Sequence, residues 1–249
     1  MTPYEQFKQE CKEEIEIQGA DGQLKKASQD WMDLVNRKKY SYHFEWLGRP
    51  IIQYPQDIIA MQELVWQIKP DLIIETGIAH GGSLIFYASM LELLVQCGEI
   101  EHGEVVGVDI EIRPHNRQAI EAHPMHKRIS MLEGSSVDSS IVEQIKAKAA
   151  GKKRVLVTLD SNHTHDHVYK ELLCYADLVT VGSYCVVFDT VIEDMPDDMF
   201  GNRPWGKGNN PKTAVELFLK DRNDFEIDDS VTNKLLVSVA PKGFLRRTR

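Results

Sequence analysis

The densest group of ionisable side chains lies at residues 160–167, which read Asp-Ser-Asn-His-Thr-His-Asp-His. Three histidines alternate there, as they do in the H-x-H-x-D-H zinc signature of metallo-β-lactamase-like hydrolases. The aspartate comes one residue too early for that signature, because the order here is H-x-H-D-H. The segment therefore indicates acid–base or metal chemistry of another kind.

One histidine of the three is favoured as the reactive group. If a helix begins just after His163, then His163 and His167 share a helix face and His165 points elsewhere, so the three cannot easily bind one ion. We therefore expect His163 to act beside Asp160 as the acid–base residue, because the pKa of histidine lies near the operating pH. His165 and His167 are expected on a solvated helix face.

A glycine-rich loop at residues 75–83, Glu-Thr-Gly-Ile-Ala-His-Gly-Gly-Ser, joins an apolar run to a helical pattern. Glycine lets the backbone approach a ligand closely, and the N-terminus of the following helix offers free N–H groups. No register of the three glycines matches the G-x-G-x-x-G fingerprint of NAD-binding proteins. Glu75 instead suits S-adenosylmethionine (SAM), whose ammonium group needs a carboxylate. The expected cofactor-binding residues of this loop are Glu75, Thr76, Gly77, His80, Gly81 and Ser83.

Two further polar positions follow apolar runs. Asp109 is placed to accept hydrogen bonds from the ribose of a nucleoside, and the alternative is an aspartate that only caps a helix. Ser135 and Ser136 follow the next apolar run in the same way. Both positions therefore resemble the ends of strands that face a ligand.

These polar groups require a scaffold of alternating strands and helices. Apolar runs predict strands at residues 72–74, 105–108, 129–132, 155–159 and 178–188, with an edge strand at 234–239. Helical patterns lie at residues 84–97, 115–122, 138–150, 165–175 and 213–220. Ligands bind at the carboxyl ends of strands in an open parallel sheet, so the polar clusters should converge. The pattern predicts a doubly wound, Rossmann-like α/β sheet that is mostly parallel and has an antiparallel edge strand.

Length and composition limit the possible functions. The chain of 249 residues suits one large domain, and its net charge of −9 repels nucleic acids and anionic membrane surfaces. Its four cysteines are widely spaced, which fits reduced thiols rather than a zinc or redox motif. No apolar stretch is long enough to span a membrane, and the first residues do not resemble a signal peptide. We expect a cytoplasmic protein that binds neither nucleic acid nor membrane.

Two segments carry weaker signals. Residues 201–208 match G-x-x-x-x-G-K, but Gly208 replaces the Ser or Thr that a P-loop needs and no strand precedes it. We expect a mobile loop there that could cover the site, with a structural turn as the alternative. The basic tail at residues 242–249 is expected to be a solvated terminus.

Several motifs together resemble the cephalosporin hydroxylase-like family, which has the SAM methyltransferase fold and includes rhamnosyl O-methyltransferases. The resemblance covers roughly residues 40–245. It depends on residues 40–42, 46–53, 55–57, 74–83, 109–116, 134–136, Asp160-Ser161 with His163, and 182–184.

The resemblance implies a fold, two cofactors and a set of site residues. It implies that residues 51–249 form a SAM-dependent methyltransferase domain. The helical extension expected at 1–50 is indicated by the residues themselves, because residues 4–37 are charged throughout and have apolar residues at irregular helical spacing. SAM would be bound by the glycine-rich loop, Asp109 and the turn at Ser135 and Ser136. A Mg²⁺-type ion would be held by acids after the fourth and fifth strands, which correspond to Asp160 and Asp189.

One position departs from the family pattern. The family usually has an acidic pair at the fifth strand, whereas this chain has Phe188 before Asp189. Glu193 and Asp194 are the nearby acids that could replace the lost carboxylate.

The expected reaction is the methylation of a hydroxyl group on a sugar or another small molecule. The divalent metal would lower the pKa of the hydroxyl, and His163 would take its proton. The negative net charge favours a neutral or polyhydroxylated acceptor. Two alternatives remain, a nicotinamide-dependent oxidoreductase and a non-catalytic SAM-binding accessory protein. A homo-oligomer is expected.

Overall fold

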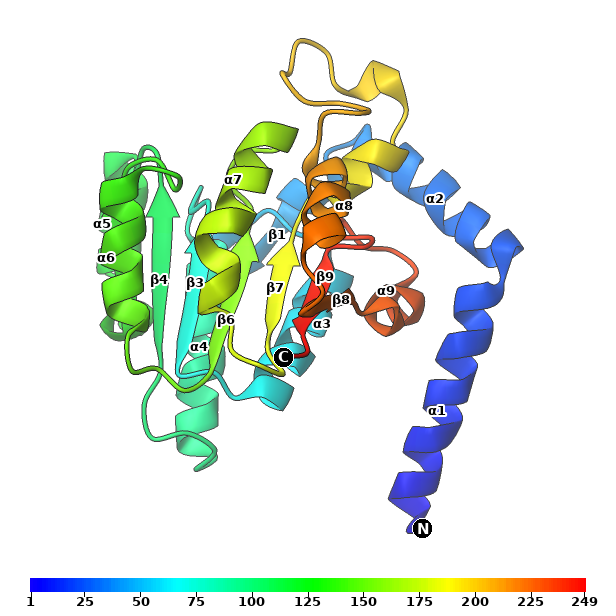
Figure 1. Ribbon diagram of the computed structural model, residues 1–249, viewed down its shortest axis with the longest axis horizontal. Coiled ribbons are helices and arrows are strands. Elements are labelled where there is room, and N and C mark those ends of the chain that lie inside the picture. The colour runs from blue at the N-terminus through cyan, green and yellow to red at the C-terminus, as the bar shows by residue number, and fades with distance from the viewer.

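The computed structural model describes residues 1–249, and its centre is a seven-stranded sheet in the order β5-β4-β3-β6-β7-β9-β8 (Figure 1). The first five strands in this order pair in parallel, and β9 and β8 add an antiparallel edge. The predicted doubly wound sheet is therefore confirmed. The strands are β3 (Leu72–Thr76), β4 (Glu104–Asp109), β5 (Ile129–Glu133), β6 (Val155–Leu159), β7 (Tyr184–Val187), β8 (Phe225–Ile227) and β9 (Phe244–Arg247).

Helices cover both faces of the sheet, which explains why the central strands are continuous apolar runs. Every residue of β3 and of β6 is buried. The core has two large clusters, of 29 and 22 buried residues, one on each face. On one face lie α3 (Pro55–Ile68), α4 (Gly82–Gln96) and α5 (Pro114–Glu121), and on the other lie α6 (Ser139–Ala149), α7 (His165–Tyr175) and α8 (Pro211–Asp221).

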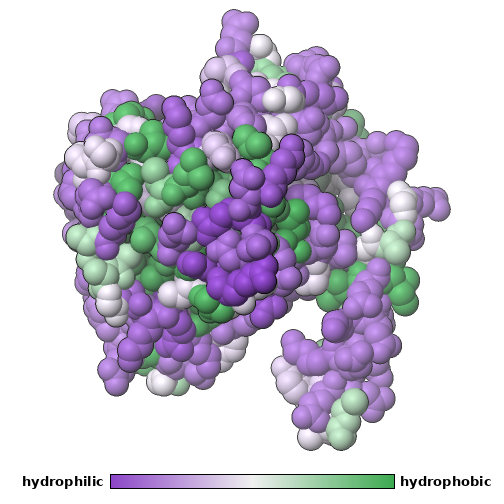
Figure 2. Space-filling model, viewed as in Figure 1, coloured by the Kyte–Doolittle hydropathy of each residue, from purple (hydrophilic) through white to green (hydrophobic).

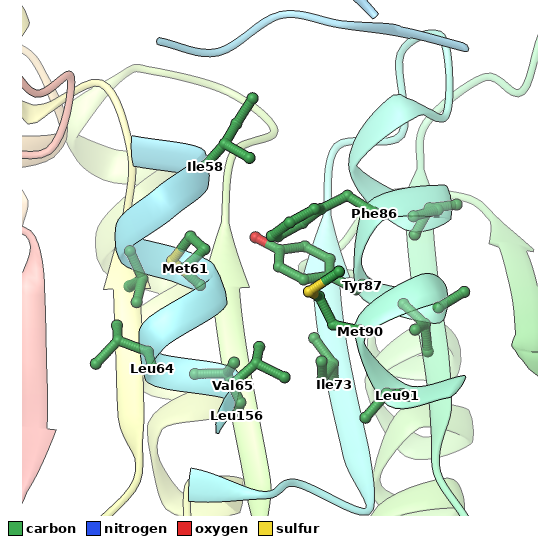
Figure 3. Packing of buried hydrophobic residues seen from close by; sticks show 14 of the residues in the cluster. Ile58, Met61, Leu64, Val65, Ile73, Phe86, Tyr87, Met90, Leu91 and Leu156 are labelled. Atoms are coloured by element: carbon green, nitrogen blue, oxygen red, sulfur yellow. The ribbon is translucent and has the colours of Figure 1, made fainter. Parts of the chain in front are cut away.

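The larger cluster fixes the helix that follows the glycine-rich loop. Met61 and Val65 of α3 point toward Tyr87 of α4 above Ile73 and Leu156 of the sheet (Figure 3). Helix α4 has a buried side chain at almost every position of its first half. Its N-terminus is therefore held rigidly at the carboxyl edge of the sheet.

The N-terminal region begins with helices, as predicted, although the extension expected at 1–50 also includes most of a β-hairpin. It contains α1 (Pro3–Ala20), α2 (Gly22–Asn36), a short 3-10 turn η1 (Tyr40–His43) and a hairpin of β1 (Phe44–Trp46) and β2 (Arg49–Ile51). Helix α1 projects from the body and meets α9 (Asp229–Leu235) only near its C-terminal end (Figure 1). The expected domain boundary near residue 50 stays a prediction.

The predicted edge strand at residues 234–239 is wrong. Helix α9 takes its first residues, and Leu236, with φ of 61°, ends that helix. Beyond it, Ser238 Oγ and Val239 N donate hydrogen bonds of 2.6 and 2.9 Å to the carboxylate of Asp57, which is fully buried. The carboxylate therefore accepts from the backbone N–H of Val239, which a neighbouring strand would otherwise have paired.

Two other boundaries also differ from the prediction. The strand expected at residues 178–188 is only β7, because the 3-10 turn η3 (Ala176–Leu178) and a bend precede it. The basic tail is not a solvated terminus, since it contains β9, in which Phe244 and Leu245 are fully buried. The remaining short 3-10 elements are η2 (Pro124–Arg128), η4 (Thr190–Asp194) and η5 (Asp197–Met199).

None of the helices combines the length and the apolar composition that crossing a bilayer requires.

Candidate active site

A cleft of about 680 Å³ opens at the carboxyl edge of the sheet, above β3, β6 and β7. This is the edge at which parallel α/β sheets bind ligands. Of the predicted site residues, the structure brings six to the wall of this cleft: Gly77, His80, Ser83, Asp160, His163 and Asp189.

Three of these residues form a compact group. Asp160 follows β6, His163 lies between β6 and α7, and Asp189 follows β7. Each offers one potential metal-ligand atom, and the three atoms lie within 4.8 Å of one another. His163 Nε2 is 3.3 Å from Asp189 Oδ2, and neither aspartate forms an ion pair with a lysine or arginine.

The electrostatics of the group favour a bound cation. Burial raises the pKa of Asp160 well above its usual range, and the charges of Asp189 and Glu75 raise it further. Three acidic groups thus influence one another at this edge of the sheet, and none of them forms an ion pair with a lysine or arginine. A cation there would stabilise the ionised carboxylates.

Glu75 lies beneath the same edge, at the fourth position of β3, and is fully buried. Ser83 Oγ donates a hydrogen bond of 2.9 Å to its Oε2 atom, whereas its Oε1 atom has no partner. Burial raises the pKa of Glu75 to about 8; the hydrogen bond from Ser83 opposes this, and the charge of Asp109 adds to it. A buried carboxylate oxygen without a partner is unfavourable unless a ligand supplies a donor.

The glycines of the loop are required by packing inside the protein. Gly77 has φ of 93°, and a Cβ atom on it would lie 2.0 Å from the carbonyl oxygen of Asp160. A Cβ atom on Gly82 would lie 2.2 Å from the carbonyl oxygen of Pro50. Packing alone therefore requires glycine at both positions, and the expected close approach of a ligand to Gly77, which lines the cleft, stays a prediction. The loop is thereby tied to the β6 loop that contains Asp160.

Side chains from three other segments hold the same loop. Asp109 Oδ2 accepts hydrogen bonds of 2.8 and 3.1 Å from the N–H groups of Ile78 and Ala79. Arg49 donates to the carbonyl of His80, and Asn116 donates to the carbonyl of Ala79 at 2.9 Å. Asp109 therefore positions the loop from outside the cleft wall, and its contact with ribose stays a prediction.

The roles of Arg49 and Asn116 in holding the loop were missed in the sequence. Arg49 also donates to Asn116 Oδ1 at 3.1 Å, so the two side chains form one bridge across the loop. Both residues lie within the motifs that carry the family resemblance, which was the signal that could have identified them.

Ser136 and His167 belong to a network behind the cleft. Ser136 is buried, and its Oγ atom is 3.0 Å from His167 Nε2. Ser161 Oγ lies 3.3 Å from the same nitrogen and donates a hydrogen bond of 2.6 Å to Glu171, which is fully buried. The network joins the turn after β5 to the loop after β6. Ser135, like Ser136, does not line the cleft.

The expectation that His165 and His167 lie on a solvated face is wrong, because both side chains are partly buried and bonded. His165 Nδ1 is 2.8 Å from Thr213 Oγ1, and its backbone N–H donates to Asn209 Oδ1. His165 thus connects α7 to the N-terminus of α8. As predicted, the three histidines do not converge on one point.

Comparison with known proteins decides the family. Residues 38–248 match the family model described as Rhamnosyl O-methyltransferase/CmcI. The chain belongs to this family. The rhamnosyl O-methyltransferase of Mycobacterium tuberculosis is 30% identical over 194 residues, which cover 77% of this chain and 73% of that protein. The Mycobacterium leprae enzyme of the same name is 27% identical over 205 residues, with 81% and 82% covered.

Solved structures agree with the fold of the Rhamnosyl O-methyltransferase/CmcI family. A structure of CmcI with Mg and SAM matches with a TM-score of 0.58 and 18% identity, over 84% of this chain and 78% of that chain. An O-methyltransferase from Bacillus cereus in complex with SAH matches with a TM-score of 0.50 and 18% identity, over 80% and 81% of the two chains. Membership of this family disfavours the alternative of a nicotinamide-dependent oxidoreductase.

The departure at the fifth strand has a structural explanation. Phe188 is buried in the larger core cluster, so this family member has an apolar contact where an acidic pair was expected. Glu193 and Asp194 do not replace the missing acid. Glu193 accepts hydrogen bonds from Gly208 and Asn210, and Asp194 forms an ion pair of 2.8 Å with Lys212.

The loop at residues 201–208 is held at its base, which favours the structural turn over a mobile segment. Asn209 Nδ2 donates to the carbonyl of Pro204 at 2.7 Å, and Asn210 Nδ2 donates to that of Gly206 at 2.9 Å. The loop brings Trp205 into the cleft, where its ring lies 4.8 Å from that of His163 in an edge-to-face contact. The loop therefore forms part of the wall beside His163.

Proposed function

We propose that the protein transfers a methyl group from SAM to a hydroxyl group of a sugar, with Mg²⁺ at Asp160 and Asp189. The observation that carries this proposal is the placement of Asp160, His163 and Asp189 in one cleft beside the buried Glu75. The relatives are named as rhamnosyl O-methyltransferases, which supports a sugar acceptor. The titles of the solved CmcI and MycE structures name Mg together with SAM or SAH.

The residues present fit SAM. The partnerless Oε1 atom of Glu75 can accept a hydrogen bond from an ammonium group, which would also favour the ionised carboxylate. No side chain caps the N-terminus of α4 after Gly81, so its N–H groups can receive a carboxylate. Asp109 would add hydrogen bonds to the ribose through lone pairs that its backbone donors leave free. Ser135 and Ser136 are proposed to support this part of the site.

The residues present also fit Mg²⁺. This ion prefers carboxylate oxygens and water to imidazole nitrogen, so Asp160 and Asp189 suit it better than His163 does. Neither carboxylate is already neutralised by a lysine or arginine. When bound, the ion would lower the pKa of the acceptor hydroxyl.

His163 is proposed as the base that removes the hydroxyl proton. Its Nε2 atom is 3.3 Å from Asp189 Oδ2, so a proton on Nε2 would point to that carboxylate. Nδ1 then carries the free lone pair that accepts the proton of the acceptor. Asp189 and the ring of Trp205 together fix the orientation of the imidazole. The chain would thereby position the oxygen and take its proton, which methyl transfer to a hydroxyl requires.

The Mg²⁺ affinity of two variants, one at Asp189 and one at Asp194, tests the proposed metal site. Asp189→Asn should weaken Mg²⁺ binding by roughly 10-fold or more, because it removes a charged ligand. The control is Asp194→Asn, which removes a nearby acid that is paired with Lys212 and does not line the cleft. Calorimetry with Mg²⁺ and SAM would measure both variants. Equal Mg²⁺ affinity in the wild type and Asp189→Asn would contradict the assigned metal site.

A further inference from the structure

The outer wall of the cleft, apart from Trp205, has no part in the chemistry proposed above. It is formed by residues 36–42, at the end of the N-terminal helices, and by the segment 195–203, which projects above the strand ends (Figure 1). In the space-filling view, this projecting segment is largely hydrophilic (Figure 2). The two parts of the wall are joined by Arg37, which donates hydrogen bonds of 2.9 and 3.0 Å to both carboxylate oxygens of Asp198.

Arg203 in this wall is a cation without an acidic partner. Its guanidinium lies 5.0 Å from the ring centre of Trp205, and it makes no salt bridge. The contact with the aromatic ring fixes the guanidinium beside the cleft without using its N–H donors in hydrogen bonds. A planar guanidinium with free donors is well suited to a carboxylate or a phosphate.

Lys39 is a second unpaired cation on the opposite part of the wall. Its backbone has φ of 56° and is held by turn hydrogen bonds of 2.9 Å to Asn36 and from Tyr42. Lys39 is exposed, belongs to the lining of the cleft and forms no ion pair with an acid. Lys39 and Arg203 thus add two unbalanced positive charges on this wall.

The nearby acids do not neutralise these two cations. Asp198 is paired with Arg37, and Asp197 lies 3.7 Å from Lys207. The chain as a whole has 38 acidic and 29 basic residues. The two free cations on one wall of the cleft are therefore opposite in sign to the net charge of the chain. Neither cation has an acidic side chain within ion-pair distance, which leaves both free to bind a negative group on a ligand.

We propose that the outer wall recognises an anionic group, a carboxylate or a phosphate, on the sugar acceptor, through Arg203 and Lys39. This inference rests on the proposed function and narrows its substrate class to charged sugars. The methylated hydroxyl would lie on the inner side, at His163, and the anionic group at the mouth of the cleft. The net charge of the chain favoured a neutral acceptor, but a net charge averages over the whole surface and says little about one wall.

Binding of matched sugars tests the inference. The probes are methyl glucuronoside, a glucose phosphate and the uncharged methyl glucoside, titrated into the full chain with S-adenosylhomocysteine and Mg²⁺ present. At least one charged sugar should bind about 10-fold more tightly than methyl glucoside, and this preference should decrease as salt is added. The carboxylate and phosphate probes show which of the two anions the wall accepts.

Substitutions of Lys39 and Arg203 test whether these two residues cause the preference for charged sugars. Lys39→Gln combined with Arg203→Gln should bring the charged and uncharged sugars to within about 3-fold of each other while SAM affinity is unchanged. The control is Lys38→Gln, which removes an exposed neighbouring lysine that does not line the cleft. A preference that persists in the double variant, the absence of any preference, or a loss of SAM affinity instead would overturn the inference. Methylation of uncharged sugars would then still support the proposed function.

Discussion

At the scale of single residues, His163 can be separated from its neighbours by mutation. His163→Ala should lower kcat by roughly 10²- to 10⁴-fold, because the acceptor proton loses its base, while SAM affinity stays nearly constant. His165→Ala removes the bond to Thr213 at the base of the Trp205 loop and should have a much smaller effect. Steady-state kinetics and SAM calorimetry measure both variants. An equal fall in both would mean that the histidines act together, and no fall in either would mean that no protein base is needed.

Glu75 has opposite effects on folding stability and on cofactor binding, because its ionised form destabilises the ligand-free fold and is the form expected to bind SAM. Its pKa in the fold, about 8, exceeds its ordinary value of 4.5, so the unfolded chain ionises first as the pH rises. The ligand-free protein should therefore lose stability between those two pH values, and the loss should be complete only above pH 8. Glu75→Gln should remove this loss and gain about 1–3 kcal/mol at pH 8.

The same substitution should weaken SAM binding by roughly 10-fold or more, since a charged acceptor is lost. Denaturant unfolding at pH 5 and pH 8, together with SAM calorimetry, measures both effects. Asp138→Asn is a suitable control, because that residue is an exposed helix cap that does not line the cleft. A Glu75→Gln variant that is destabilised at pH 8 and binds SAM normally would contradict the role assigned to Glu75.

Much of the site at this scale could be predicted from residue type and position. The structure brings Asp160, His163 and Asp189 together, because parallel strands end at one edge of the sheet. Residue type and spacing alone do not predict the contacts of Arg49, Asn116 and the buried Glu171; for the first two, only the family motifs gave a signal. Their partners are backbone carbonyls and hydroxyls from distant segments, and no local spacing encodes such contacts.

At the scale of elements, the loop between β3 and α4 depends on a glycine that touches the next loop. Gly77→Ala should destabilise the protein by about 3 kcal/mol or more, because its Cβ atom would collide with the Asp160 carbonyl in addition to the strain of a positive φ. Gly151→Ala is the matched control, since its φ is 78° and nothing lies within 4 Å of the added atom. It should cost only about 1 kcal/mol. Similar unfolding free energies for the two variants would disprove the tight contact between the loops.

The strand and helix order was predictable because buried parallel strands and amphipathic helices have different apolar periods. The main error was at residues 234–239, where a run of mostly apolar residues indicated an edge strand. There the buried carboxylate of Asp57, distant in sequence, bonds Ser238 and Val239 and holds the segment in an irregular path. A tertiary contact of this kind overrides a local pattern, and the sequence contains no signal for it.

At the scale of the whole molecule, the net charge indicates which classes of partner are disfavoured but says nothing about the charge distribution within the cleft. The value of −9 argues against nucleic acid as a partner, but it hides the local balance in the cleft, where acids line the inner wall and free cations the outer wall. The N-terminal helices contribute directly to that outer wall, through Arg37 at the end of α2. The expected homo-oligomer stays a prediction, which sedimentation of the full chain would test.

Methyl transfer itself is the measurement that tests the central claim most directly. The full chain would be incubated with SAM, Mg²⁺ and a panel of charged and uncharged sugars, and the products would be analysed by mass spectrometry. We predict a sugar that has gained one methyl group, formed in equal amount with S-adenosylhomocysteine and lost when EDTA is added or Asp189 is changed to Asn. Absence of any methylated sugar together with absence of SAM binding would contradict the account, and full activity in excess EDTA would contradict its metal site.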